Sequence, residues 1–143
     1  NGGSAADSQH LSAEFVSRFN FNRPALASLA LTTDTSILTS IGNDYGFDKI
    51  FSRQCESIVK KNDIVFGIST SGNSQNILEA IKVAKEKGMK TIILTGKDGG
   101  QLASLADLEI RAPHSEYADR AQEIHIKVIH AFIDGIERQL GLQ

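Results

Sequence analysis

Short apolar runs and amphipathic segments alternate most clearly in the middle of the chain. Residues 64–68 form a compact apolar run, which is typical of a strand buried on both faces. A helix is predicted after it, because four apolar residues recur at the i, i+3, i+4, i+7 spacing of one helix face: Ile77, Ala80, Ile81 and Ala84. Gly88 ends this helix, and residues 91–94 form a second apolar run. The order strand, helix, strand predicts parallel pairing.

The flanking sequence continues this alternation. Further strands are predicted over residues 26–31 and 108–111, and further helices over 5–19, 34–41, 47–59 and 118–140. The last helix carries a long apolar stripe, made of Ile126, Ile129, Ile133, Ile136 and Leu140. We therefore expect a single α/β domain over residues 1–143, a parallel sheet flanked by helices, with ligands bound at the carboxyl ends of the strands.

Composition and charge exclude several classes of function. The net charge is −2, so bulk electrostatics favours neither a nucleic acid nor an anionic membrane as a partner. No apolar run approaches the roughly 20 residues that span a bilayer. Cys55 is the only cysteine, which excludes an internal disulfide and fits a reducing compartment. We expect a cytoplasmic protein.

The chain opens on a glycine-rich start, Asn1-Gly2-Gly3-Ser4, directly before a predicted helix. Two glycines and a serine at a helix start could let a ligand touch the backbone, although a flexible terminus has the same composition. A Gly-Gly pair in this position usually follows a strand. We therefore expect an N-terminal segment with a further strand to precede these residues in a longer chain.

The strongest local motif is the loop between the first buried strand and its helix, Ser69-Thr70-Ser71-Gly72-Asn73-Ser74. Free N–H groups and the positive dipole end of the helix favour an anion, the hydroxyls add donors, and Gly72 would let the backbone approach it closely. No lysine accompanies the loop, so it is not a nucleotide P-loop. An ordinary capped loop is the alternative. We predict a phosphate site.

Acid and base groups gather on the first and last helices. His10 and Glu14 are spaced i, i+4, which suits a metal, an acid/base pair or a plain surface hydrogen bond. Gln122, His125 and His130 lie on the last helix, and periodicity alone does not choose between the two histidines.

Two further polar positions have a structural alternative. Asp119 could act as a helix cap. The stretch 42–47, which contains Asn43 and Asp44, could contact sugar hydroxyls or form a simple turn.

Taken in order, these segments resemble the phosphoheptose isomerases. They read Asn-Gly-Gly-Ser with Ala-Asp-Ser-Gln-His, Leu-Thr-Thr-Asp-Thr-Ser, Gly-Asn-Asp-Tyr-Gly-Phe, Gly-Ile-Ser-Thr-Ser-Gly-Asn-Ser, Leu-Thr-Gly-Lys-Asp-Gly-Gly and Gln-Glu-Ile-His-Ile-Lys-Val-Ile-His. The resemblance runs from Asn1 to about Leu140, whereas the serine loop alone marks only the wider sugar isomerase (SIS) domain.

The resemblance implies a flavodoxin-like parallel sheet, a homotetramer, and N-terminal helices and a first strand ahead of this sequence. It also implies an aldose–ketose isomerase that converts sedoheptulose 7-phosphate to D-glycero-D-manno-heptose 7-phosphate through an enediol. That reaction is the first step toward bacterial ADP- or GDP-heptose, for lipopolysaccharide or other heptosides.

The resemblance also assigns roles to residues. The phosphate end is lined by Ser4, Ser69, Thr70, Ser71 and Ser74. The rest of the sugar is held by Asn1, Gly2, Gly3, Glu14, Asn43, Asp44, Asp119 and Gln122. Glu14 and His130 are the acid/base pair. One zinc ion per subunit is bound by His10, Glu14, Gln122 and His130, and no nucleotide or redox cofactor is implied.

Helix geometry adds an expectation about the oligomer. Gln122 and His130 are separated by about 12 Å of axial rise, too far to reach one metal through bonds near 2 Å. We therefore predict that one subunit supplies Gln122 and a neighbour supplies His130, with the apolar stripe of the last helix forming part of the contact.

Two other functions remain possible at this stage. One is a non-enzymatic SIS-domain tetramer that binds the replication initiator. The other is a regulatory sensor of sugar phosphates.

Overall fold

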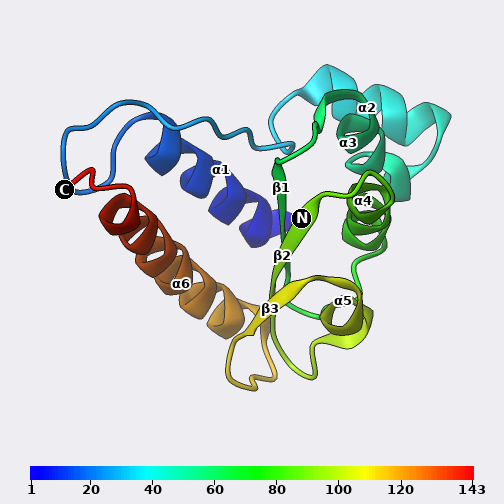
Figure 1. Cartoon of the computed structure of the whole chain (residues 1–143). Helices are drawn as coiled ribbons and strands as arrows, with labels where there is room; N and C mark the ends of the chain where they lie inside the picture. Colours follow the sequence, from blue (N-terminus) through cyan, green and yellow to red (C-terminus); the bar gives the residue numbers. More distant parts are fainter.

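The computed structural model describes residues 1–143 and has helices on both faces of a small parallel sheet (Figure 1). The strands are β1 (Ile64–Ser69), β2 (Lys90–Thr95) and β3 (Leu108–Arg111), in the order β1-β2-β3. The helices are α1 (Gly2–Val16), α2 (Thr35–Asp44), a 3₁₀ helix η1 (Phe47–Lys49), α3 (Ser52–Ile58), α4 (Gln75–Glu86), α5 (Gly100–Leu105) and α6 (Ala118–Gln139). The expected parallel sheet flanked by helices is confirmed.

Alternate residues of the strands form two cores, one on each face. Ile68 and Leu94 point toward α1 and α6, where they pack with Leu11, Ile129 and Ile133. Ile93 points the other way, toward α4 and α5. Gly67 lies on that second face, and a Cβ there would sit 2.6 Å from the Cδ1 of Ile93. The nearest α4 atom, the Cγ2 of Ile77, would lie 3.2 Å from that Cβ. The glycine therefore lets Ile93 and α4 pack closely on this face of the strand.

The local signals that place the helices are mostly confirmed. The Asp34 carboxylate caps α2 by accepting a hydrogen bond from the Ile37 N–H at 2.9 Å. Gly88 follows α4 with a φ of 73°, as expected for a residue just beyond a helix. The helix predicted over residues 47–59 is instead divided into η1 and α3. None of the helices is both long and apolar enough to cross a membrane.

The apolar stripe of α6 does not have the role we expected. Ile129 and Ile133 are fully buried in the core of their own chain, and Ile126 packs against the same cluster. Leu140, at the end of the helix, is the exposed member of the stripe. The expectation that this stripe forms a contact between subunits is therefore wrong for its central residues.

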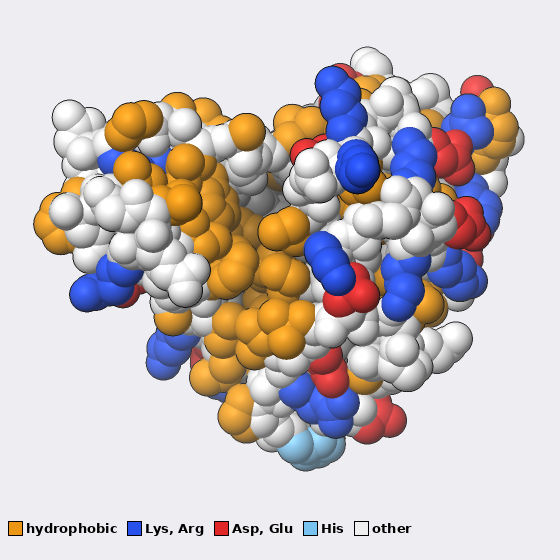
Figure 2. Space-filling model, viewed as in Figure 1, with side chains coloured by type: hydrophobic (Ala, Val, Ile, Leu, Met, Phe, Trp, Pro, Cys, Tyr) orange, Lys and Arg blue, Asp and Glu red, His pale blue; other side chains and the backbone are white.

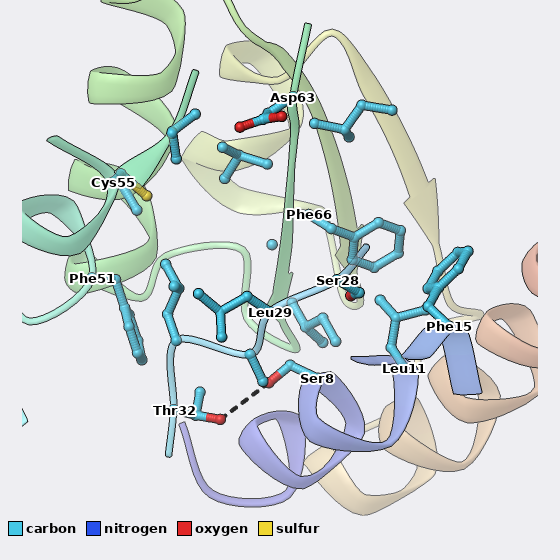
Figure 3. A pocket seen from close by; sticks show the side chains of 18 of the residues that line it. Ser8, Leu11, Phe15, Ser28, Leu29, Thr32, Phe51, Cys55, Asp63 and Phe66 are labelled. Atoms are coloured by element: carbon cyan, nitrogen blue, oxygen red, sulfur yellow. Dashed lines mark hydrogen bonds between the residues drawn. The ribbon is translucent and has the colours of Figure 1, made fainter. Parts of the chain in front are cut away.

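The strand predicted over residues 26–31 is also wrong. This segment is extended but has no β pairing. At its start the Leu26 N–H donates to the Phe15 carbonyl at 2.9 Å, and at its end the Leu31 carbonyl accepts a hydrogen bond from the Gln54 side chain at 3.0 Å. It faces β1 across an apolar groove of about 960 Å³ (Figures 2 and 3). Because a strand needs a hydrogen-bonded neighbour, the apolar pattern of this segment is not enough to make it one.

Candidate active site

The loop from Ser69 to Ser74 lies at the carboxyl end of β1, where the sequence predicted a ligand. The hydroxyl oxygens of Ser69 and Ser74 lie 2.8 Å apart, and Ser69 is almost completely buried. Ser74 occupies the N-cap position of α4, but its side chain makes no capping hydrogen bond. The first turn of α4 therefore keeps N–H groups that are free to bind an anion.

Packing against the next loop fixes the shape of this one. Gly72 has a φ of 67°, and a Cβ there would overlap the Gly99 carbonyl. The Gly72 carbonyl accepts a hydrogen bond from Leu102 N–H at 3.0 Å, and the Asn73 side chain accepts one from Gln101 N–H at 3.0 Å. Gly72 thus allows close contact with the start of α5, and its service to an approaching ligand stays a prediction.

The glycine-rich start of the chain reaches the same place. The side-chain amides of Asn1 and Asn76 form a reciprocal pair, with hydrogen bonds of 3.0 and 2.8 Å. Asn76 is buried at the start of α4. The start of the chain therefore lies against the start of α4, next to the Ser69–Ser74 loop. Asn76 could not be found from local sequence, because its partner lies 75 positions away.

The first turns of α6 and α1 pack against each other. A Cβ on Gly3 would lie 2.6 Å from the Cδ of Gln122, so the glycine lets this side-chain amide pack against the backbone of α1. Ser4, the next residue of α1, is buried. Gln122 thus lies beside the Asn1–Ser4 segment of its own chain.

Farther along the same two helices, three titratable side chains meet. The Nε2 atoms of His10 and His130 lie 2.9 Å apart, and the Glu14 Oε1 lies 3.5 Å from His10 Nε2. The Phe19 ring packs beside the His130 imidazole, with centroids 5.3 Å apart. His10 and Glu14 remain 40% and 21% exposed, so this cluster is open to a ligand.

The structure resolves which histidine of α6 faces α1. His130 meets His10, whereas His125 is buried and places its Nε2 atom 2.8 Å from the Thr95 carbonyl oxygen. His125 therefore has a structural contact with β2.

Gln122 does not join the cluster in one chain. The helices α1 and α6 run side by side in the same direction, so Gln122 faces Gly3 while His130 faces His10 (Figure 1). About two helical turns separate the two positions. No group of three or more His, Cys, Asp or Glu side chains within the chain is arranged to hold a metal ion.

The donor types of the cluster nevertheless suit zinc. The Nε2 atom of His10 lies within 3.5 Å of both the His130 Nε2 and the Glu14 Oε1. Imidazole nitrogens and carboxylate oxygens are ligands that zinc takes in proteins. If the two facing nitrogens moved slightly apart and one further ligand were added, the four atoms could coordinate zinc tetrahedrally.

The remaining predicted residues lie at the surface. Asn43 and Asp44 end α2, where their side chains are exposed and hydrogen-bonded to each other at 2.8 Å. Figure 1 places α2 on the other side of the sheet from α6, so one chain does not bring them to the cluster. Asp119 is exposed in the first turn of α6, and Tyr117 rather than Asp119 occupies the N-cap position.

Sequence reasoning missed Asp7. This residue lies on α1 one turn before His10, and its Oδ2 atom is buried without a hydrogen-bond partner. Burial raises the pKa of Asp7, while the nearby His125 and His10 act to lower it. Its position one helical turn before His10 indicates that Asp7 lies on the same side of α1 as the cluster, but an aspartate within a helix is usually exposed.

Comparison with known proteins identifies the family. A model of the SIS domain matches residues 1–96. The phosphoheptose isomerase of Vibrio vulnificus is 55% identical over 140 residues, which cover 98% of this chain and 73% of that protein. The chain belongs to the phosphoheptose isomerase family.

Solved structures of the family agree with the fold. The phosphoheptose isomerase of Neisseria gonorrhoeae superposes with a TM-score of 0.88 at 50% identity, over 96% of this chain and 73% of that one. The family member from Francisella tularensis gives a TM-score of 0.91 at 38% identity, with the same coverage of both chains. The expected SIS-domain fold is confirmed.

Proposed function

We propose that this protein interconverts sedoheptulose 7-phosphate and D-glycero-D-manno-heptose 7-phosphate through an enediol. The observation that carries the proposal is the meeting of His10, Glu14 and His130 between α1 and α6, in a chain whose relatives are named phosphoheptose isomerase. The buried thiol of Cys55 fits a reducing cytoplasm.

The phosphate group of the substrate would bind at the Ser69–Ser74 loop. The uncapped start of α4 offers N–H groups and a positive dipole end, and Ser71 and Ser74 can donate through their hydroxyls. An anchored phosphate orients the other end of the sugar and contributes binding energy that the chemical step can use.

Glu14 and His130 would carry the proton transfers. The isomerisation moves a proton between C1 and C2 and redistributes protons between the two oxygens. A carboxylate can take the proton from one carbon and return it to the other, while an imidazole exchanges a proton with the oxygens. Both side chains belong to the open cluster, so a sugar can reach them.

A zinc ion would be held by His10, Glu14 and His130, together with the partner subunit's Gln122. When bound, it would polarise the sugar carbonyl and stabilise the enediolate. The roles of Glu14 and His130 as proton carriers do not require the ion to take part in the proton transfers.

We propose a homotetramer with shared sites, which the family resemblance implies and the same geometry supports. Gln122 lies against Gly3 in its own chain, about 12 Å along α6 from His130. A neighbouring copy could bring its Gln122 to the open cluster, and closed symmetry would repeat the arrangement once per subunit.

The enzyme is favoured over the two alternatives, because the cluster is intact and the named relatives are enzymes. The test is to incubate the purified protein with sedoheptulose 7-phosphate, with and without a chelator, and to follow the aldose by NMR. We expect conversion. The absence of conversion by a folded, zinc-loaded oligomer would contradict the proposal.

A further inference from the structure

A buried ion pair joins Arg23, in the segment that follows α1, to Glu137 near the end of α6, beyond the cluster described above. The Arg23 Nε atom lies 2.6 Å from the Glu137 Oε1 atom, and the two side chains are 1% and 0% exposed. The second carboxylate oxygen of Glu137 is buried without a partner. Arg23 is therefore the one side chain that compensates the Glu137 carboxylate.

The other donors of the Arg23 guanidinium go to the last turn of α1. Its NH2 group donates to the Glu14 carbonyl at 2.7 Å, and its NH1 group donates to the Phe15 carbonyl at 2.9 Å. NH1 also donates to the carbonyl of the next residue in the chain, Pro24, at 3.1 Å. Carbonyls in the last turn of a helix lack partners within the helix, and a cation there also interacts favourably with the helix dipole. Arg23 thus caps α1 at the backbone of Glu14 itself.

We propose that Arg23 is a positioning residue for Glu14, with Glu137 as its anchor on α6. The helix that carries Glu137 also carries His130, so the ion pair holds the Glu14 backbone at a fixed place relative to His130. This proposal rests on the proposed isomerase function, in which Glu14 and His130 transfer protons.

A purely structural role makes a different prediction. A buried ion pair that only stabilises the fold can be exchanged for apolar side chains without loss, because removing both charges also removes their desolvation cost. A positioning role cannot be exchanged in this way, because apolar side chains do not hold the Glu14 carbonyl.

The test therefore compares Arg23→Met with the double variant Arg23→Met/Glu137→Met. We expect the single variant to be less stable, because it leaves a buried carboxylate unpaired. We expect the double variant to regain the part of the thermal stability that the unpaired carboxylate had cost, but to keep a kcat lowered by about 10- to 100-fold. KM for the sugar phosphate should stay within about 2-fold, because the phosphate loop lies elsewhere.

Two controls sharpen this test. Arg18→Ala removes an exposed arginine from the same segment after α1 and should leave kcat unchanged. In Arg23→Ala, added guanidinium should restore part of kcat, because it can refill the space and donate to the same carbonyls, whereas ammonium should not. A double variant with wild-type kcat would overturn the proposal.

A readout without turnover separates this proposal from the proposed function. The chain has 4 histidines, so their imidazole NMR signals can be assigned individually. In the double variant the signals of His10 and His130 should shift, while that of the exposed His114 should not. Unchanged His10 and His130 signals would contradict a positioning role, whether or not the protein is an isomerase.

Discussion

The two ends of the candidate site are built in opposite ways. The Ser69–Ser74 loop is closely packed, with its glycine against the Gly99 carbonyl and its backbone hydrogen-bonded to α5. The cluster of His10, Glu14 and His130 is open, and its two imidazole nitrogens face each other. On the proposed function, a phosphate site could be complete within one chain because backbone N–H groups would supply it, whereas the proton-transfer end would take its last zinc ligand from another chain.

The largest effect should come from the proton carriers. We expect Glu14→Gln and His130→Gln each to lower kcat by about 10²- to 10⁴-fold, because each removes a group that transfers protons. Steady-state kinetics on the folded oligomer checks this.

His125→Gln is the matched variant on the same helix. It should lower thermal stability, because it disturbs a buried contact with the Thr95 carbonyl, but it should largely keep kcat. If Glu14→Gln or His130→Gln retains most of kcat, that residue does not transfer protons.

A smaller effect is expected at the closely packed Ser69–Ser74 loop. Ser71→Ala/Ser74→Ala should raise KM for the sugar phosphate by about 10- to 100-fold, because hydrogen bonds to a charged group contribute about 1.5–3 kcal/mol. The measurement is KM against kcat for the double variant. Ser104→Ala, which changes a serine at the surface of α5, should leave KM unchanged. Unchanged kinetics of the double variant would remove these hydroxyls from the phosphate site.

Zinc should stabilise the open end without any substrate. At a zinc concentration about 100-fold above Kd we expect Tm to rise by roughly 5–10 °C, because the ion binds only the folded state. Scanning calorimetry with zinc and with a chelator measures this shift. His10→Gln should abolish most of it, whereas His114→Gln, an exposed control, should not. An equal shift in both variants would place the ion elsewhere.

The smallest effect concerns Cys55, which belongs to neither end. Burial raises the pKa of its thiol from 9.0 to about 11, so the reactive thiolate is scarce in the folded protein near pH 8. Below pH 9 the thiol is neutral in both the folded and the unfolded protein, and its burial costs no ionisation free energy. As the pH rises from 9 toward 11, the unfolded protein loses this proton first, so the free energy of unfolding falls. Alkylation should be slow at pH 8 and fast after denaturation. Fast alkylation of the native protein would show that the thiol is accessible.

Local patterns were enough to predict β1, β2, α4 and the serine loop, because each follows from a short apolar period or a helix start. The same reasoning failed for residues 26–31. An apolar extended segment becomes a strand only if another strand lies beside it, and the sequence of the segment alone does not show whether one does. It also failed for Ile129 and Ile133, because periodicity shows which face of α6 is apolar but not what covers that face.

Contacts between distant residues could not be predicted in this way. The pairs Asn1–Asn76 and Arg23–Glu137 join positions 75 and 114 residues apart, and no local pattern marks them. The identity of the acid/base histidine came from the family resemblance. The structure supports it by placing His130 beside His10 and His125 beside β2.

The central claim, that two chains complete one site, is tested by mixing two inactive variants. His130→Ala lacks part of the cluster, and Gln122→Ala lacks the ligand that a neighbour would supply. After subunit exchange, we predict that mixed tetramers regain activity at sites with an intact cluster from one chain and Gln122 from the other.

The matched control mixes His130→Ala with Glu14→Gln, whose lesions fall in the same cluster of one chain. Every site of that mixture carries one lesion, so no activity should return. Recovery in the first mixture alone is the predicted result. If mass spectrometry confirms exchange and the first mixture stays inactive, the shared-site account is contradicted.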